Sequence, residues 1–79
     1  MRAIILCKLG INAIKKVIEE IKTIPQIKKV MSLTGDYDLL AEIEVDSTEE
    51  LYEIFSEKID VIEGIIASNT HVVMKAWEK

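Results

Sequence analysis

The chain has 79 residues, which is room for one domain with a small core, so we expect a single domain over residues 1–79. It is 49% hydrophobic and 30% charged, a balance that excludes disorder and indicates a packed globular domain. The net charge of −4 argues against direct binding to nucleic acid, because phosphate backbones attract basic surfaces.

Cysteine content and hydropathy indicate the compartment. Cys7 is the only cysteine, so the chain cannot form an intrachain disulfide or a paired-cysteine metal site. The apolar stretch at residues 3–7 is too short for the core of a signal peptide, and no apolar run approaches the roughly 20 residues that span a bilayer. We therefore expect a cytoplasmic protein with no membrane partner.

The spacing of apolar residues predicts the secondary structure. Strands are expected over residues 3–9, 27–33, 39–45 and 65–77. One helix is expected to start after an N-cap at Asn12 and to end at Pro25, and a second to start at Ser47, where Glu50 completes a capping box. The predicted buried stripes of the two helices are Ile14, Val17, Ile18 and Ile21, and Leu51, Ile54, Phe55 and Ile59.

The order of these elements predicts an α+β fold, the ferredoxin-like βαββαβ sandwich. Its four-stranded antiparallel sheet should have the first and third strands in the centre and both helices on one face. The first strand is apolar on both faces, because Ile4 and Leu6 alternate with Ala3, Ile5 and Cys7. A second copy should therefore cover the face without helices, as a homodimer packed sheet to sheet.

Catalytic and metal-binding patterns are weak. His71 is the only histidine and lies in a predicted strand, where a surface or interface role is commoner than a general base. Asp36 and Asp38 could contact a cation, but two carboxylates without further oxygen ligands are a poor calcium site. The loop "KLGINA", residues 8–13, has no glycine-rich phosphate cradle. We expect neither a metal nor a cofactor.

The hairpin "TGDYD", Thr34 to Asp38, has two interpretations. As a turn, it uses Gly35 for positive φ and Asp36 to bond its own backbone. As a site, it offers a hydroxyl from Thr34, an approachable N–H at Gly35, and carboxylates from Asp36 and Asp38. These groups could hold a zwitterion, with N–H donors for its carboxylate and acids for its ammonium group.

Two stretches carry a family resemblance. "VMSLTGDYDLLAEIEV", residues 30–45, and "IEGIIASNTHVVMKAW", residues 62–77, resemble the effector-binding RAM domain of the leucine-responsive/asparagine-operon (Lrp/AsnC) regulators. The likeness runs from Ala3 to about Ala76 and includes the order of elements. The hairpin is its most specific part, and the segment from Gly64 to Met74 is the second.

The resemblance implies a sheet-to-sheet homodimer, often assembled into larger homo-oligomers, that binds a small amino acid where dimers meet. By position, the effector loop falls on Thr34, Gly35, Asp36, Tyr37 and Asp38, and the strand residues facing it across the contact fall on Ser68 and Thr70. Ser68 stands where the family often has threonine, which keeps the hydroxyl and loses a methyl group.

The chain departs from the family's regulators at its start, because it begins with the first strand of the RAM domain. It therefore resembles the stand-alone RAM proteins, or an excised domain, that lack the helix-turn-helix. We expect it to modulate transcription or amino-acid metabolism without binding DNA, and full-length Lrp/AsnC regulators are possible partners.

Three alternatives stay open. A small dimeric α+β enzyme, an isomerase or monooxygenase, would need a buried, hydrogen-bonded His71 beside a cavity. A purely structural oligomerisation module would leave the hairpin as a solvent-exposed turn remote from subunit contacts. The ACT domain shares the order of elements, but its glycine-rich first loop is poorly matched by residues 8–13.

Overall fold

The computed structural model describes all residues, 1–79. It contains four strands and two helical segments in the predicted order. The elements are β1 (Arg2–Leu9), α1 (Ile14–Ile21), β2 (Ile27–Ser32), β3 (Leu39–Glu44), α2 (Thr48–Ile54), the π-helical turn η1 (Phe55–Ile59) that continues α2, and β4 (Ile65–Val72).

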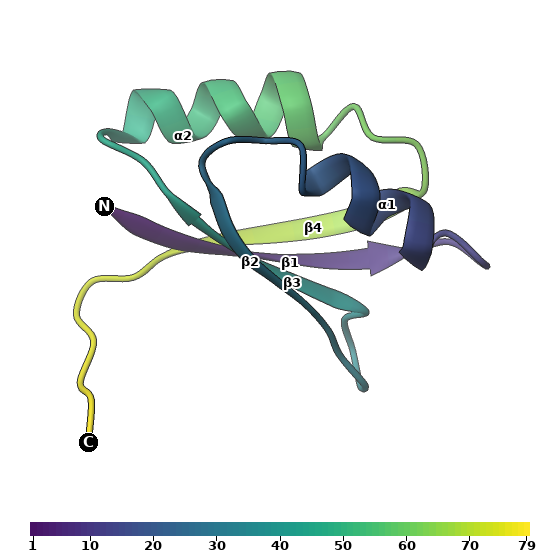
Figure 1. Cartoon of the computed structure of the whole chain (residues 1–79), viewed down its shortest axis with the longest axis horizontal. Helices are drawn as coiled ribbons and strands as arrows, with labels where there is room; N and C mark the ends of the chain where they lie inside the picture. Colours follow the sequence, from purple (N-terminus) through teal and green to yellow (C-terminus); the bar gives the residue numbers. More distant parts are fainter.

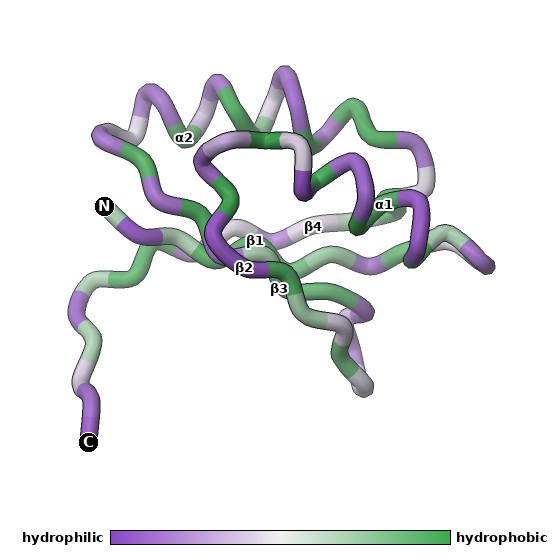
Figure 2. The backbone as a smooth tube through the Cα atoms, viewed as in Figure 1, coloured by the Kyte–Doolittle hydropathy of each residue, from purple (hydrophilic) through white to green (hydrophobic).

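The strands form one antiparallel sheet in the order β2-β3-β1-β4, and both helices pack on the same side of it (Figure 1). This confirms the ferredoxin-like α+β prediction, with the first and third strands in the centre. In Figure 2 the hydrophobic turns of α2 face the sheet and its hydrophilic turns face away, as expected for helices that cover a sheet on one side only. No helix has the length and apolar character needed to cross a membrane.

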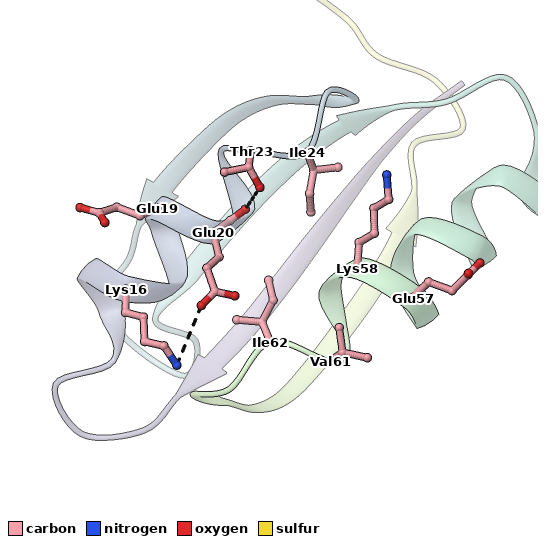
Figure 3. Close-up of a pocket in the computed structure, with 9 residues that line it drawn as sticks. All are labelled: Lys16, Glu19, Glu20, Thr23, Ile24, Glu57, Lys58, Val61 and Ile62. Atoms are coloured by element: carbon pink, nitrogen blue, oxygen red, sulfur yellow. Dashed lines mark hydrogen bonds and ion pairs between the residues drawn. The ribbon is translucent and has the colours of Figure 1, made fainter.

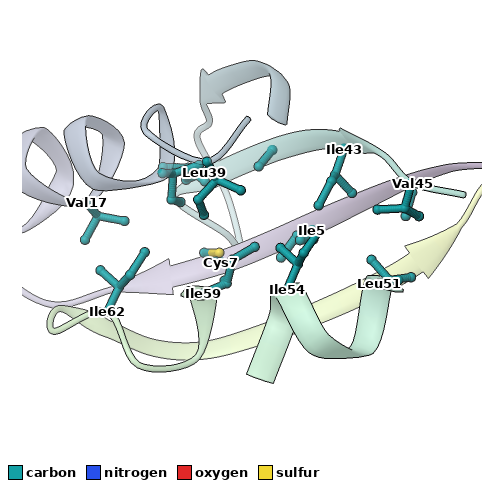
Figure 4. Packing of buried hydrophobic residues seen from close by; sticks show 14 residues of the cluster. Ile5, Cys7, Val17, Leu39, Ile43, Val45, Leu51, Ile54, Ile59 and Ile62 are labelled. Carbon is teal, nitrogen blue, oxygen red and sulfur yellow. The ribbon is translucent and has the colours of Figure 1, made fainter. Parts of the chain in front are cut away.

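The core lies between the helices and the sheet (Figure 4). Ala3, Ile5 and Cys7 of β1 are fully buried there, as the alternation of the first strand predicts. Fourteen residues form this cluster, and all of them are hydrophobic. The remaining members are Val17, Ile21, Ile24, Leu39, Ala41, Ile43, Val45, Leu51, Ile54, Ile59 and Ile62.

The second helix begins as predicted and then widens. The Ser47 side chain accepts a hydrogen bond from the Glu50 N–H at 3.1 Å, and the Glu50 carboxylate accepts one from the Asp46 N–H at 2.7 Å. Further along, the Asp60 N–H donates to the Phe55 carbonyl, the five-residue spacing of a π-helix. The wider turn brings Ile59 to full burial five residues after Ile54.

The start of the first helix was predicted wrongly. Asn12 has a φ of 60° and lies in the left-handed region, so the N-cap is Ala13, which makes no side-chain capping bond. Asparagine tolerates this conformation better than most residues, and here it turns the chain from β1 into α1. As a consequence Ile14 lies at the edge of the buried stripe and is 38% exposed.

The last strand is shorter than predicted, because it ends at Val72 and not at Trp77. Ala3 pairs with Val72 and the Val73 N–H donates to the Arg2 carbonyl, so β1 offers no backbone partner beyond this point. Residues 74–79 extend away from the sheet on the side opposite the helices (Figure 1). Met74 and Trp77 are 96% and 79% exposed there.

The side of the sheet without helices, here called the open face, is apolar at its centre. Register places Leu6 between Leu40 of β3 and Asn69 of β4, and Leu40 opposite Met31 of β2. Leu6, Leu40 and Met31 are each half-buried. The strand pairings place on this face Arg2, Ile4, Leu6, Lys8, Lys29, Met31, Leu40, Glu42, Glu44, Ala67, Asn69 and His71.

Candidate functional site

The predicted effector loop is the connection between β2 and β3. Its tip, Thr34 to Asp36, is exposed and extends to the side of the sheet opposite the helices (Figure 1). Gly35 has a φ of 103°, and a Cβ there would meet nothing within 4 Å, so glycine is required by conformation and not by space. No hydrogen bond within the chain involves the side chain of Thr34 or Asp36 or the N–H of Gly35.

The second half of the loop is fastened to β1. The Asp38 Oδ2 accepts a hydrogen bond from the Leu9 N–H at 2.8 Å. The Asp38 N–H donates to the Cys7 carbonyl, and the Leu33 N–H donates to the Asp38 carbonyl, each at 2.9 Å. Asp38 is half-buried, so the two acids of the loop occupy different environments.

Tyr37 fastens the loop to β4. Its phenol oxygen accepts a hydrogen bond from the side-chain amide of Asn69. Asn69 lies opposite Leu6 on the open face, so this contact crosses β1 on that face. Asn69 was absent from the predicted site, although an asparagine inside a strand is unusual enough to have marked it.

Ser68 and Thr70 lie on the other side of the sheet. They pair with Cys7 and Ile5 of β1, which are buried beneath the helices, and directly opposed residues share a face. Within one chain they are therefore not brought together with Tyr37. They line a hollow of about 340 Å³ at the edge of α2. The other lining residues are Thr48, Leu51, Tyr52, Phe55 and Asn69.

The largest hollow lies elsewhere, between α1 and the end of η1 (Figure 3). Its volume is about 670 Å³, but charged side chains of both signs surround it. Within it, Lys16 Nζ lies 3.9 Å from Glu20 Oε1. It contains none of the predicted site residues. The lining residues are Lys16, Glu19, Glu20, Thr23, Ile24, Glu57, Lys58, Val61 and Ile62.

The side chains capable of acid-base or nucleophilic chemistry are poorly placed for it. The His71 side chain is exposed and makes no hydrogen bond in the chain, so it lacks the buried, hydrogen-bonded setting that the enzyme alternative requires. Cys7 is fully buried, and burial raises the pKa of its thiol to about 11. A thiol with this pKa stays protonated at neutral pH and is a weak nucleophile.

Comparison with known proteins identifies the type of domain. The family model described as the Lrp/AsnC ligand binding domain matches residues 2–79. The HTH-type transcriptional regulator FL11 of Pyrococcus furiosus is 33% identical over 77 residues, which are 98% of this chain and 50% of that protein. A homocitrate synthase of Sulfurisphaera tokodaii is 36% identical over 59 residues, 75% of this chain and 13% of the enzyme.

The solved structure of TTHA0845 from Thermus thermophilus has a TM-score of 0.90 and 29% identity, covering 99% of this chain and 98% of that one. The chain thus matches about half of FL11 and nearly all of TTHA0845. The match over residues 2–79 takes in both the loop and β4. The chain belongs to the Lrp/AsnC ligand-binding domain family.

Proposed function

We propose that the chain binds a free amino acid through the β2–β3 loop and couples this binding to its assembly as a homo-oligomer. The observation that carries the proposal is the exposed tip, where the Asp36 carboxylate, the Thr34 hydroxyl and the Gly35 N–H have no partner within the chain. A carboxylate suits the ammonium group of an amino acid, and a hydroxyl and an N–H suit its carboxylate.

A single copy does not complete the pocket. The tip is exposed on the open-face side, whereas the hydroxyls of Ser68 and Thr70 face the helix layer. A pocket that uses both sets needs the loop of one copy and β4 of another. The effector then binds only the assembly that forms the pocket, and mass action shifts the subunits toward that assembly.

The apolar centre of the open face supports a sheet-to-sheet dimer as the basic unit. Leu6, Leu40 and Met31 form a row across the three strands β1, β3 and β2. Covering this row removes apolar surface from water, and a two-fold axis lets one face cover its own copy.

The output is regulatory. With a net charge of −4 the chain is poorly suited to bind DNA, and it would act by joining full-length Lrp/AsnC regulators in mixed assemblies. The match to part of a homocitrate synthase favours a second output, the control of an enzyme by the same kind of domain. Native mass spectrometry after mixing the chain with an FL11-type regulator distinguishes the two outputs, because only the association with regulators predicts mixed oligomers.

Calorimetric titration with the standard L-amino acids at millimolar concentration tests the proposal. At least one should bind, and its analogue without the α-amino group should bind at least about tenfold more weakly. Asp36→Ala should abolish binding while the far-UV circular dichroism of the chain is unchanged, because Asp36 is exposed. If no amino acid binds, or if Asp36→Ala binds as the wild type does, the proposal is wrong.

A further inference from the structure

The two acids of the effector loop differ in what they already bind. Both oxygens of Asp36 are without a partner in the chain, whereas Asp38 Oδ2 accepts the Leu9 N–H at 2.8 Å. The bond to the Leu9 N–H fixes the orientation of the Asp38 carboxylate on β1, and rotating the group away would leave a partly buried donor unpaired.

The bond to Leu9 continues the sheet. The β1–β3 ladder ends where Cys7 pairs with Leu39, and the β1–β4 register shifts between Lys8 and Leu9. The Asp38 N–H to the Cys7 carbonyl and the Leu9 N–H to Asp38 Oδ2 add one further step, in which a side chain takes the place of a backbone carbonyl. The loop therefore leaves the sheet from a fixed position.

The neighbouring residue fixes the loop in a second direction. Tyr37 reaches across β1 and accepts a hydrogen bond from Asn69, between the two hydroxyl residues of β4. Tyr37 and Asp38 thus hold the loop against β4 and β1, while residues 34–36 stay exposed.

We propose that Asp38 and the Tyr37–Asn69 pair are positioning residues of the effector loop, and that Asp36 is the carboxylate that binds the ammonium group of the amino acid. This rests on the proposed function and assigns different roles to the two acids. It adds Asn69 as a residue whose loss weakens binding without contact to the ligand.

Isosteric substitutions separate charge from position. Asp36→Asn removes the charge and should weaken binding of the tightest amino acid in the panel by about tenfold or more. Asp38→Leu removes the acceptor and should weaken it comparably. Asp38→Asn restores an acceptor for the Leu9 N–H without the charge, and should recover affinity to within about threefold of the wild type. Equal losses in Asp36→Asn and Asp38→Asn would overturn the division of roles.

Amide hydrogen exchange gives a readout that does not depend on a ligand. The Leu9 N–H should be protected in the wild type and in Asp38→Asn and unprotected in Asp38→Leu, whereas Asp36→Asn should leave it protected. Protection of Leu9 in Asp38→Leu contradicts the positioning role, whatever the affinities. If the wild type binds no amino acid, the proposed function and the role of Asp36 fail together, while the exchange result still decides the role of Asp38.

The Tyr37–Asn69 pair is tested by a double-mutant cycle in affinity. Tyr37→Phe and Asn69→Leu should each weaken binding by about threefold or more, and the double variant should bind no more weakly than the poorer single variant. Asn69→Asp should recover binding in the presence of Tyr37 only, because the phenol can then donate. If the loss of affinity in the double variant equals the product of the two single losses, the pair does not act through this contact. Recovery of binding by Asn69→Asp in the Tyr37→Phe background would contradict that role too.

Discussion

Gly64 and Val17 are so close that any side chain at position 64 would be crowded. A Cβ on Gly64 would lie 3.1 Å from Val17 Cγ2 and 3.0 Å from the Ala13 Cβ, and Gly64 has a φ of 109°. The turn that starts β4 therefore packs directly on α1. The same turn also holds the connection between β1 and α1, because the Gly10 N–H donates to the Gly64 carbonyl at 2.9 Å.

Gly64→Ala should lower the free energy of unfolding by about 3 kcal/mol, because it combines a left-handed conformation with crowding in the core. Gly35→Ala is the matched control, since Gly35 has a similar φ of 103° but open space around it, and it should cost about 1 kcal/mol. Urea denaturation of both variants measures the difference. Equal costs would mean that the core relaxes around the new methyl group.

Stability should fall at alkaline pH because of Cys7. Its pKa is raised from 9.0 to about 11 by burial, so the unfolded chain loses this proton at lower pH than the folded one. The contribution of the protonated Cys7 thiol to the free energy of unfolding is fully present below pH 9 and is lost as the pH rises through about 11. The loss is at most about 3 kcal/mol. In Cys7→Ala the decline between these pH values should be shallower, as urea midpoints at each pH would record.

The same burial should protect the thiol from reagents. Because Cys7 is fully buried, the native protein should react with a thiol reagent only through unfolding, and addition of denaturant should speed the reaction by orders of magnitude. Rapid labelling of the folded protein at neutral pH would contradict the position of Cys7 in the core.

Leu6→Lys should separate the subunits without unfolding them. Leu6 is half-buried at the centre of the open face, so a lysine there remains tolerable in a single copy but is costly in a sheet-to-sheet contact. Val61→Lys is the control, because Val61 is 67% exposed on the helix layer. Light scattering should show a smaller mass for Leu6→Lys alone. A reduced mass in Val61→Lys only would place the contact on the helices.

Ser47→Ala should cost about 1 kcal/mol, because it removes the oxygen that accepts from the Glu50 N–H at the start of α2. Ser47→Asp keeps an acceptor and should retain most of that stability in the same urea experiment. If both substitutions are neutral, the Glu50 carboxylate bond to the Asp46 N–H is enough to cap the helix.

Local patterns predicted most of the fold. Alternation in β1, the helical stripes and the Ser47 cap depend on neighbours in sequence, and they were right to within a few residues. The end of β4 was wrong because its length depends on where β1 begins, at Arg2. Asn12 was assigned to a helix cap, but asparagine is favoured both at caps and in the left-handed region. The sequence alone does not distinguish these two positions.

The candidate site was predictable only in part. Local chemistry and family resemblance single out Thr34 to Asp38, whose role in binding stays a prediction, but they do not show that Asp38 is hydrogen-bonded within the chain and Asp36 is not. The partner of Asp38 is Leu9, 29 residues away, and that of Tyr37 is Asn69, 32 residues away. Such contacts depend on strand register, and the same register places Ser68 and Thr70 on the face opposite Asn69.

Sedimentation velocity with and without the bound amino acid tests the central claim most directly. If the loop of one copy and β4 of another share the ligand, the tightest-binding amino acid should shift the distribution to a larger or more uniform assembly, increasingly with its concentration up to saturation, and not at all in Asp36→Ala. An identical distribution in the presence of a saturating amino acid would contradict coupling between the loop and assembly.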